Sequence, residues 1–322
     1  NVTKLTIQGA GTIPTGSTKG SAGSTVITLN GQYGIVYTGS AAKKFRLSNI
    51  DLRVSSATYD QNFYMITVSG TTLPSSGGGF RIDHNDFRTS YRGRKIYINS
   101  RAYGVIDHNY YRGTYNSGWY GMFVSVGEGN TGGNQSWYRG IGVNSWDQVF
   151  LEDNDVGGNG SSSEGAHTMF CDCENGGRVV ARYNTILNMY FGGHGADSTK
   201  RACLSYVIHN NTTNITDLPV SGMSPWLGVR DGTHIVYDNT INETRSGVPV
   251  TNSMYAPPIY LRNYRSYSGW STSNTSPYTN LCTGGTSKGC FGTTTYAQSC
   301  TSDTNCGGET GSCVTIDGGT GD

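Results

Sequence analysis

The sequence predicts an all-β protein in which short parallel strands stack as a solenoid. The first observation is a motif that recurs seven times: an apolar run, one or two polar residues, an asparagine and a second apolar run. The second is its spacing, because the asparagines at positions 49, 85, 109, 154, 184, 211 and 239 lie 36, 24, 45, 30, 27 and 28 residues apart. The third is that β-branched and aromatic residues fill the apolar runs without heptads. Repeats of this length, each stacking only on its neighbours, are typical of solenoids.

Each copy of the motif predicts two strands that meet at its asparagine, a residue that tolerates the left-handed backbone of a sharp bend. Successive coils lie about 4.8 Å apart, so equivalent positions form columns along the molecule. The positions three before and two after the asparagine are expected to face the core, and the asparagines to form a ladder. The first column is Ile82, Ile106, Leu151, Ala181, Ile208 and Val236, and the second is Phe87, Tyr111, Val156, Ile186, Thr213 and Ile241.

On these repeats, over roughly residues 45–245, the chain resembles the right-handed parallel β-helix superfamily, which includes pectate lyases and many secreted repeat proteins. The resemblance implies a single-stranded right-handed parallel β-helix with the pectate-lyase-like fold. It implies little about activity, because this fold hosts several chemistries and also purely binding roles.

Three regions are expected along the chain. Residues 1–44 form the first coils, with strands at 4–11 and 24–30, and residues 45–265 form the β-helix. Within the β-helix, an insertion at 113–146 holds an extra coil near 121–126, and 254–265 is a last coil. Residues 266–322 are an irregular tail and the start of a linker. No amphipathic helix is found to cover the ends of the stack, so a strand-and-loop cap or another chain is expected there.

Composition excludes some classes of function. The chain has 322 residues, of which 14% are charged, and a net charge of +1, so an electrostatic nucleic-acid binder is excluded. No apolar run reaches the length of a membrane span, and no signal peptide is found. Because the sequence opens at Asn1 rather than Met, it reads as a processed or trimmed mature protein.

The eight cysteines indicate disulfides and an oxidising environment, hence an extracellular or cell-surface protein. Three lie in the β-helix region and five in the tail, so full pairing requires at least one bridge between the two regions. Zinc is the alternative, but no Cys-x-x-Cys pair exists. The expected disulfide cysteines are Cys171, Cys173, Cys203, Cys282, Cys290, Cys300, Cys306 and Cys313.

Two neighbouring coils contain the densest cluster of residues whose side chains can act in catalysis or metal binding. His167 precedes Asn184 by 17 residues and His194 precedes Asn211 by 17, which predicts that the imidazoles share one column. Such a pair can perform general acid–base catalysis or hold a divalent metal, and nearby cations can neutralise an acidic sugar. The structural alternative is that stacked identical residues only fill a column. The candidate catalytic residues are His167, His194, Asp197, Arg178 and Arg201, and the candidate substrate-binding residues include Asp172, Glu174 and Lys200.

Aromatic residues in the insertion are further candidates for substrate binding. Trp119, Trp137 and Trp146 are of the kind that stack on sugar rings, and packing of a long loop is an equal alternative. The segment Gly193-His194-Gly195 resembles a triplet of the polygalacturonase-type glycoside hydrolases. The other segments of that family are missing, as are the calcium and arginine segments of pectate lyases, so neither activity is carried over.

A second column contains acidic residues. Asp83, Asp107 and Glu152 each lie two positions before their asparagine, and stacked carboxylates repel one another unless they are neutralised. Calcium is therefore a candidate cofactor at this column. The alternative, which we favour, is that these carboxylates face water or pair with the arginines at positions 81, 88 and 112.

Two classes of function follow from these observations. The first is a secreted or cell-surface protein that binds polysaccharide and cleaves it as a lyase or glycoside hydrolase. The second is a non-catalytic structural or adhesive protein, such as a fibre subunit, an adhesin or a tail spike. For the second class, the uncapped ends allow copies of the chain to stack end to end.

Overall fold

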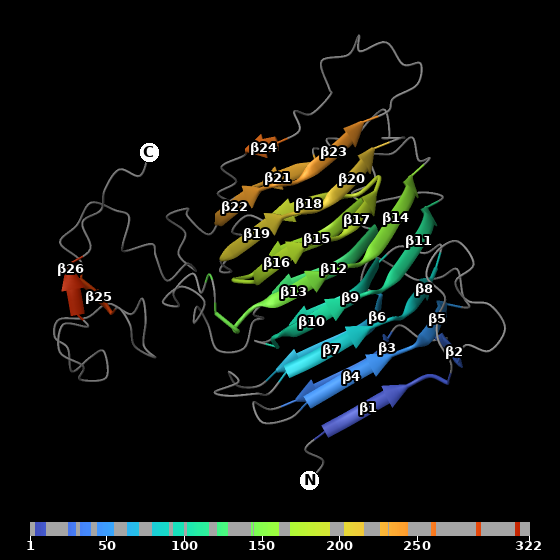
Figure 1. Cartoon of the computed structure of the whole chain (residues 1–322). Helices are drawn as coiled ribbons and strands as arrows, with labels where there is room; N and C mark the ends of the chain where they lie inside the picture. Colours follow the sequence, from blue (N-terminus) through green and yellow to red (C-terminus); the bar gives the residue numbers. More distant parts are fainter. Residues whose placement is uncertain are drawn as a thin grey trace.

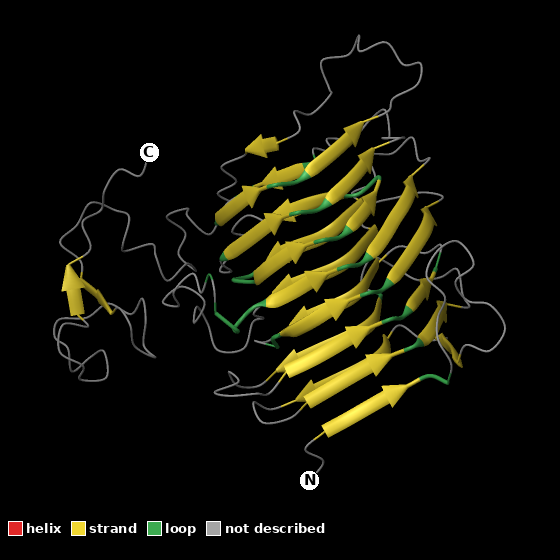
Figure 2. Cartoon of the chain, in the orientation of Figure 1, coloured by secondary structure: helices red, strands yellow, loops and turns green. Residues whose placement is uncertain are grey.

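The computed structural model describes residues 4–10, 25–29, 33–39, 44–54, 63–70, 79–89, 93–99, 102–115, 121–127, 143, 145–160, 168–193, 203–215, 226–230, 232–243, 259–261, 288–290 and 313–315. These residues form strands and turns, and no helix occurs among them (Figure 2). The described residues likewise include no helix long and apolar enough to cross a membrane.

Three parallel sheets contain almost all of the strands. Sheet A consists of β1 (Lys4–Gln8), β4 (Lys44–Ser48), β7 (Gly79–Asp83), β10 (Gly104–Asp107), β13 (Val149–Glu152), β16 (Arg178–Arg182), β19 (Ser205–His209) and β22 (Thr233–Tyr237). Sheet B consists of β2 (Thr25–Leu29), β5 (Ile50–Val54), β8 (Asp86–Arg88), β11 (Tyr110–Tyr115), β14 (Asp155–Gly160), β17 (Thr185–Leu187), β20 (Thr212–Ile215) and β23 (Thr240–Glu243). Sheet C consists of β3 (Tyr33–Gly39), β6 (Tyr64–Gly70), β9 (Gly93–Asn99), β12 (Gly121–Gly127), β15 (Thr168–Glu174), β18 (Tyr190–Gly193), β21 (Leu227–Val229) and β24 (Ile259–Leu261).

The chain passes through sheets A, B and C in turn and then returns to sheet A. Each strand is therefore hydrogen-bonded to the strand three places further along the chain (Figure 1). We number these turns coil 1 (β1–β3) to coil 8 (β22–β24). The arrangement confirms the predicted all-β stack of parallel strands and is consistent with a parallel β-helix. It also corrects the expected extra coil at 121–126, because β12 is the sheet C strand of coil 4. Residues 254–265 were expected to form a last coil, and β24, which lies within them, is the sheet C strand of coil 8.

The predicted core columns are confirmed for coils 3 to 7. In sheet A the register places Ile106 opposite Ile82 and Leu151, and all three side chains are fully buried. In sheet B, Phe87, Tyr111, Val156, Ile186 and Thr213 are fully buried in the same way. Coil 8 is the exception, because no further coil covers it among the described residues: Val236 is only partly buried and Ile241 is exposed.

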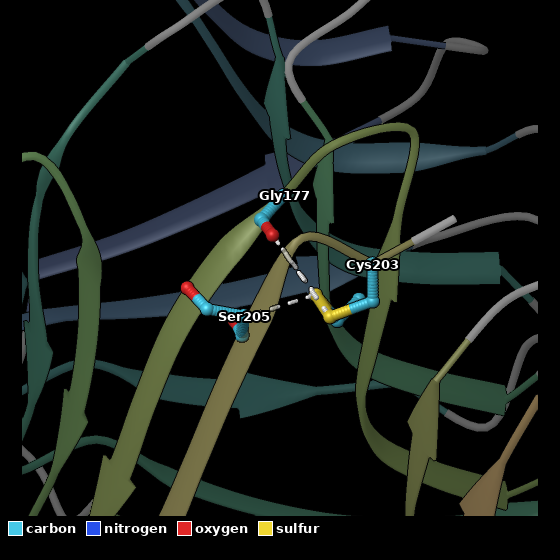
Figure 3. Close-up of a disulfide and its surroundings, with 4 residues drawn as sticks. Gly177, Cys203 and Ser205 are labelled. Carbon is cyan, nitrogen blue, oxygen red and sulfur yellow. Dashed lines mark hydrogen bonds between the residues drawn. A yellow bond between two sulfur atoms is a disulfide. The ribbon is translucent and has the colours of Figure 1, made fainter. Parts of the chain in front are cut away.

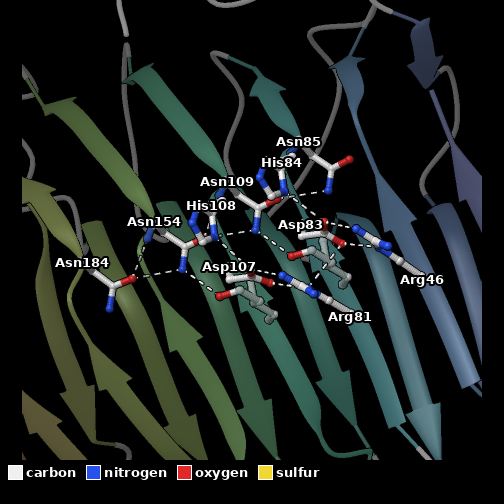
Figure 4. Close-up of polar contacts among 12 residues, drawn as sticks. Arg46, Arg81, Asp83, His84, Asn85, Asp107, His108, Asn109, Asn154 and Asn184 are labelled. Atoms are coloured by element: carbon white, nitrogen blue, oxygen red, sulfur yellow. Dashed lines mark hydrogen bonds and ion pairs between the residues drawn. The ribbon is translucent and has the colours of Figure 1, made fainter. Parts of the chain in front are cut away.

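The asparagine ladder is present along the corner between sheets A and B (Figure 4). In a typical rung, the Oδ1 atom of Asn154 accepts bonds from both the backbone nitrogen and Nδ2 of Asn109, each at 3.0 Å. The Nδ2 atom of Asn154 donates to the backbone oxygen of Ile106 at 2.8 Å and to Asn184. Each buried amide is therefore satisfied on both sides. The ladder residues are Asn85, Asn109, Asn154, Asn184, Asn211 and Asn239.

The left-handed residue of each corner lies one position before the ladder asparagine, which corrects the expected role of that asparagine. His84, His108 and Asp153 have φ angles of 56°, 53° and 51°. The same applies to Asn49, with φ of 58°, so Asn49 is the bend residue of coil 2 and not a rung of the ladder. Ile50 takes the ladder position there and donates its backbone N–H to Oδ1 of Asn85, where the ladder ends.

Apolar side chains are exposed at both ends of the stack. Val36 in coil 1 and Ile235 in coil 8 are among them, along with Leu5, Val26 and Ile241. Leu5 lies opposite the buried Phe45, so it occupies a core position that no further coil of the chain covers. Within the described residues, the two terminal coils therefore leave strand edges and apolar side chains without a covering helix.

The disulfide Cys173–Cys203 links β15 of coil 5 to the residue just before sheet A of coil 7 (Figure 3). The sulfur of Cys173 lies 3.3 Å from the backbone oxygen of Gly177 inside the core. The expectation that Cys171 is also paired is wrong, because it is a buried free thiol. Cys171 belongs to the core together with Cys173, and burial raises the pKa of its thiol far above its ordinary value, although a hydrogen bond with Tyr206 acts to lower it.

Of the tail, the structure describes one antiparallel pair, β25 (Lys288–Cys290) and β26 (Cys313–Thr315). The side chains of Cys282, Cys290, Cys300, Cys306 and Cys313 lie outside the described part of the chain, so their pairing stays a prediction. The boundaries expected at 44/45 and 265/266 also stay predictions.

Candidate functional site

Most of the residues expected to act on a substrate lie outside the described residues. They are His167, His194, Asp197, Lys200, Arg201, Trp119 and Trp137. The strands beside the two histidines have a defined register, with Met169 opposite Tyr190 and Cys173 opposite Gly193. In the sequence His167 directly precedes β15 and His194 directly follows β18, and both lie outside the described residues, so their shared column stays a prediction. The connections to sheet A differ in length, at 175–177 and 194–204.

The structure brings together two of the remaining candidates. Asp172 and Glu174 alternate with the inward-facing Cys171 and Cys173 on β15, so both carboxylates lie on the outer face of sheet C. Both residues are buried. Arg178 begins β16 in sheet A and donates to the backbone oxygen of Asp147 at 3.5 Å. Arg178 therefore belongs to a different sheet from the two carboxylates.

Trp146 lies just before β13 at the start of coil 5 and is 90% exposed. The alternative for these tryptophans, packing of the long loop, would bury the side chain, which does not fit the exposure of Trp146. An exposed indole of this kind is available to stack on a ligand. Trp146 precedes a sheet A strand, so it is not on the same sheet as Asp172 and Glu174.

Glu174 is one end of a polar network that crosses three coils on the outer face of sheet C. Ser125 of coil 4 donates its hydroxyl proton to Oε1 of Glu174 at 2.8 Å. The Nη2 atom of Arg94 in coil 3 lies 3.5 Å from the same oxygen. Asp172 is directly opposite Ser125 in the parallel register. Charged side chains are rarely buried, because removing them from water costs free energy. A cluster of buried carboxylates and a guanidinium group on the outer face of a sheet is therefore unusual for a purely structural region.

Two stacked tyrosines flank the arginine of this network. The rings of Tyr64 and Tyr97 lie 4.8 Å apart with an interplanar angle of 21°. Arg94 donates to the hydroxyl of Tyr64 at 3.0 Å, and its guanidinium carbon lies 5.3 Å from the centre of the Tyr97 ring. We call Tyr64, Arg94, Tyr97, Ser125, Asp172 and Glu174 the sheet C cluster.

The sheet C cluster has perturbed electrostatics. Burial raises the pKa of Tyr97 to about 12, and the carboxylate of Glu174 adds to the effect. Burial acts to lower the pKa of Arg94, but the charges of Glu174 and Asp172 outweigh it and raise the pKa. The cluster therefore contains two acids and one base that stays protonated at any ordinary pH. Strong perturbation by burial together with a specific charged neighbour is typical of functional sites.

An apolar patch adjoins the cluster on the same sheet. Met122, Met169 and Tyr190 are buried together, apart from the main core. Met122 lies opposite Arg94 in the register, and Met169 lies opposite Met122. The outer face of sheet C thus combines apolar side chains with charged groups, as ligand sites commonly do.

Arginines neutralise the acidic column of sheet A at Asp83, Asp107 and Glu152, in agreement with the favoured alternative to a calcium site. Both carboxylate oxygens of Asp83 accept bonds from Arg46 at 2.8 and 2.7 Å, and those of Asp107 accept bonds from Arg81 at 3.0 and 2.7 Å (Figure 4). Arg182 binds a single oxygen of Glu152, with its Nε donating to Oε1 at 2.8 Å. Within the described residues, no group of three or more potential ligands is arranged for a metal ion.

The arginines at positions 81, 88 and 112 were expected to pair with the acidic column, and only one of them does. Arg81 does pair with the acidic column, whereas Arg88 and Arg112 lie on sheet B and pair with Asp86 and Asp155. Burial alone would raise the pKa of Asp83, but its bonds to Arg46 and His84 outweigh burial and lower it.

Sequence reasoning missed Tyr64, Arg94, Tyr97 and Ser125. These residues lie on sheet C, whose strands contain no recurring asparagine and begin at variable distances from the motif. A usable signal exists in the alternation of Ile96 and Ile98 with Tyr97 and Asn99, which indicates a strand, although the two adjacent cations Arg94 and Lys95 interrupt the alternation.

The geometry permits ligand binding and proton transfer at one place. Asp172 and Glu174 supply two carboxyl groups on one face of one strand, Arg94 supplies a fixed cation, and the tyrosines supply flat apolar surface. Comparisons of the chain with known protein families, with curated proteins and with solved structures find no match. The functional conclusion therefore depends on this geometry alone.

Proposed function

We propose that the chain is an extracellular right-handed parallel β-helix protein that binds polysaccharide along the outer face of sheet C. The observation that carries this proposal is the sheet C cluster, in which Arg94, Ser125 and Glu174 from three successive coils meet on the outside of a sheet. Carbohydrates are bound by flat aromatic surfaces together with charged hydrogen-bonding groups. Tyr64, Arg94 and Tyr97 supply both at the partly exposed part of the cluster, whereas Ser125, Asp172 and Glu174 are buried. The repeat of about 4.8 Å between coils suits an extended polymer that runs along the solenoid axis.

The same cluster suits hydrolysis of a glycosidic bond. Residues two apart on one face of a strand have Cα atoms roughly 6.6 Å apart. Inverting glycoside hydrolases hold their two carboxyl groups about 6.5–9.5 Å apart so that a water molecule fits between them and the sugar. In this proposal one of Asp172 and Glu174 protonates the leaving oxygen and the other activates the water. Arg94 would hold the ionised partner in place.

Binding and cleavage can be tested separately on purified protein. Retention on a panel of neutral, amino and uronic-acid polymers measures binding, and release of reducing ends measures cleavage. Glu174→Gln and Asp172→Asn keep the side-chain shapes, so both are expected to abolish cleavage, while Arg94→Met is expected to abolish binding as well. Glu152→Gln is the matched control, since Glu152 is an arginine-paired carboxylate of sheet A. If the wild type is retained by no polymer, or if all four variants behave alike, the cluster is a structural network and the proposal fails.

The alternative function as a fibre subunit is favoured by a different observation. Coils 1 and 8 expose apolar side chains at core positions, Leu5 at one end and Ile241 at the other. A second copy stacked head to tail would cover these positions and pair the open strand edges. Sedimentation over a range of protein concentrations tests this function, with Leu5→Lys and Ile241→Lys as variants. Filaments that form equally well with both charged variants would contradict end-to-end stacking.

The extracellular location is part of the proposal. The disulfide Cys173–Cys203 supports it, because disulfides form and persist mainly in oxidising compartments. A fusion to a secretion signal, followed by mass mapping without reduction, would show whether this bridge forms in the exported protein.

A further inference from the structure

The outer face of sheet A in coils 1 to 3 carries four cations that the proposed function does not use. Lys4 lies directly opposite Lys44 in the parallel register, and Arg46 lies directly opposite Arg81. Lys44 and Arg46 are two residues apart on β4, so their side chains leave the same face of the strand. We call Lys4, Lys44, Arg46 and Arg81 the sheet A cation patch.

The sheet A cation patch concentrates positive charge at the surface. The described strands β1, β4, β7 and β10 contain two carboxylates against these four cations, which leaves 4 − 2 = two positive charges, whereas the whole chain has a net charge of +1. Both lysines are exposed, and the side chains of Arg46 and Arg81 are 42% and 46% exposed. The side chains of Asp83 and Asp107 are only 0% and 5% exposed, so the negative charges lie beneath the positive ones (Figure 4).

The two carboxylates fix the guanidinium groups in place. Arg46 donates from Nε and Nη2 to both oxygens of Asp83, and Arg81 donates from the same two atoms to both oxygens of Asp107. The Nε atom of Arg81 also lies 3.7 Å from Oδ1 of Asp83, so this one carboxylate lies beside both guanidinium groups. Each pairing uses one edge of a planar guanidinium group, and the Nη1 atom on its other side keeps N–H donors for a second acceptor.

We propose that the sheet A cation patch binds the sulfate esters of a sulfated polysaccharide. Cations directly opposite one another on adjacent strands repel, and an anion between them removes that repulsion. The Cα atoms of Lys44 and Arg46 lie roughly 6.6 Å apart and those of Arg46 and Arg81 about 4.8 Å apart, so the three side chains form a triangle. This triangle can face the three terminal oxygens of a sulfate ester, whereas a carboxylate and the phosphodiester of a nucleic acid have two such oxygens each.

The direction of the patch favours an extended polymer over a small anion. From coil 1 to coil 3 the patch spans two strand spacings along the solenoid axis, or about 9.6 Å. A single-stranded nucleic acid is bound by aromatic side chains that stack on its bases, but the aromatic side chains of β1, β4 and β7, Phe45 and Phe80, are buried. The patch lies on a different sheet from the sheet C cluster, so either surface can bind without the other.

Fluorescence anisotropy with labelled dextran sulfate tests the patch on the full chain. The wild type is expected to bind at low salt and to bind more weakly as salt rises, because exposed charge pairs are screened. Lys4→Gln and Lys44→Gln leave both arginine–aspartate pairs intact, and each is expected to weaken binding about fivefold. Arg81→Lys keeps the charge but loses the planar fork, and a similar loss is expected. Arg182→Gln is the matched control, because it removes one partly exposed cation from sheet A in coil 6, outside the patch.

Competition with unlabelled polymers identifies the group that is recognised. Neutral dextran, polygalacturonate and single-stranded DNA are each expected to need a concentration at least about tenfold higher than dextran sulfate to displace the label. A smaller difference for any of them refutes sulfate esters as the ligand. No binding by the wild type at low salt, full affinity in both lysine variants, or an equal loss in Arg182→Gln refutes the site. Circular dichroism of each variant establishes that the fold is retained.

Discussion

Lys95 provides the sharpest test of the energetics, because this lysine lies inside the core. Its side chain is fully buried, its Nζ donates to the backbone oxygen of Gly93 at 3.0 Å, and Nζ lies 5.4 Å from the centre of the Tyr111 ring. Burial lowers the pKa of Lys95 from 10.5 to about 7. The perturbation we consider is Lys95→Met, which keeps the length of the side chain and removes the charge.

The sign follows from the lowered pKa. Below pH 7 the lysine is protonated in the folded and unfolded chain, and folding carries the full penalty of burying the charge. Between pH 7 and 10.5 only the unfolded chain holds the proton, so this residue makes stability rise with pH by about 1.4 kcal/mol per unit. The shift from 10.5 to about 7 corresponds to at most about 5 kcal/mol. Above pH 10.5 the penalty is gone.

Denaturant unfolding followed by circular dichroism at pH 6, 7, 8, 9 and 10 measures this effect. Lys95→Met is expected to be the more stable protein at pH 6 and to converge with the wild type toward pH 10. Lys44→Met is the control, because Lys44 is exposed on β4. Since other groups also titrate over this range, the difference between variant and wild type is the relevant quantity. A difference that does not change with pH would refute the assignment of a buried, titrating Lys95.

Three further predictions concern the ladder and the cysteines. Asn154→Ala removes four hydrogen bonds of a buried amide and is expected to lower the free energy of unfolding by at least about 3 kcal/mol in a denaturant titration. The control is Asn242→Ala at an exposed position, which should change this free energy by less than about 1 kcal/mol. Cys203→Ser opens a disulfide that spans 30 residues, and the denaturation midpoint should fall by the equivalent of about 3–4 kcal/mol; an unchanged midpoint would show that the bridge is not formed. Iodoacetamide should label Cys171 only after unfolding, because the thiol is buried and its pKa is raised, so labelling of the native protein, detected by mass spectrometry, would contradict its position in the core.

The sequence was informative about sheets A and B because both flank the asparagine. Each copy of the motif places core residues such as Ile106 and Tyr111 at fixed distances from its rung, so the columns could be aligned without a structure. The coil boundary at residue 49 was misjudged by one position because Ile50 replaces the asparagine and Asn49 is the bend residue. A single residue type thus has two roles at this corner, and spacing alone does not separate them.

Sheet C and its cluster could not be predicted in the same way. The strands β9, β12 and β15 share no residue type at a fixed position, and the connections before and after them vary in length. The network among Arg94, Ser125 and Glu174 depends on a register across three coils that only the three-dimensional pairing defines. Asp172 and Glu174 were identified because they lie close to His167 in the sequence, whereas the partner Ser125 is 49 residues away from Glu174.

The corner between sheets A and B has one further consequence, for how such a chain can change without losing its fold. From coil 3 to coil 8 this corner is always two residues long, as at 84–85 and 238–239, and its ladder leaves no room for an insertion. The other two connections range from two residues at 188–189 to twenty-one at 128–148. New segments can therefore enter the chain beside sheet C without shifting any core column. One corner of each coil therefore has a constant length, whereas the other two corners accept insertions. Sheet C lies between those two corners, so it is the face where new binding specificities can be introduced by evolution or by design.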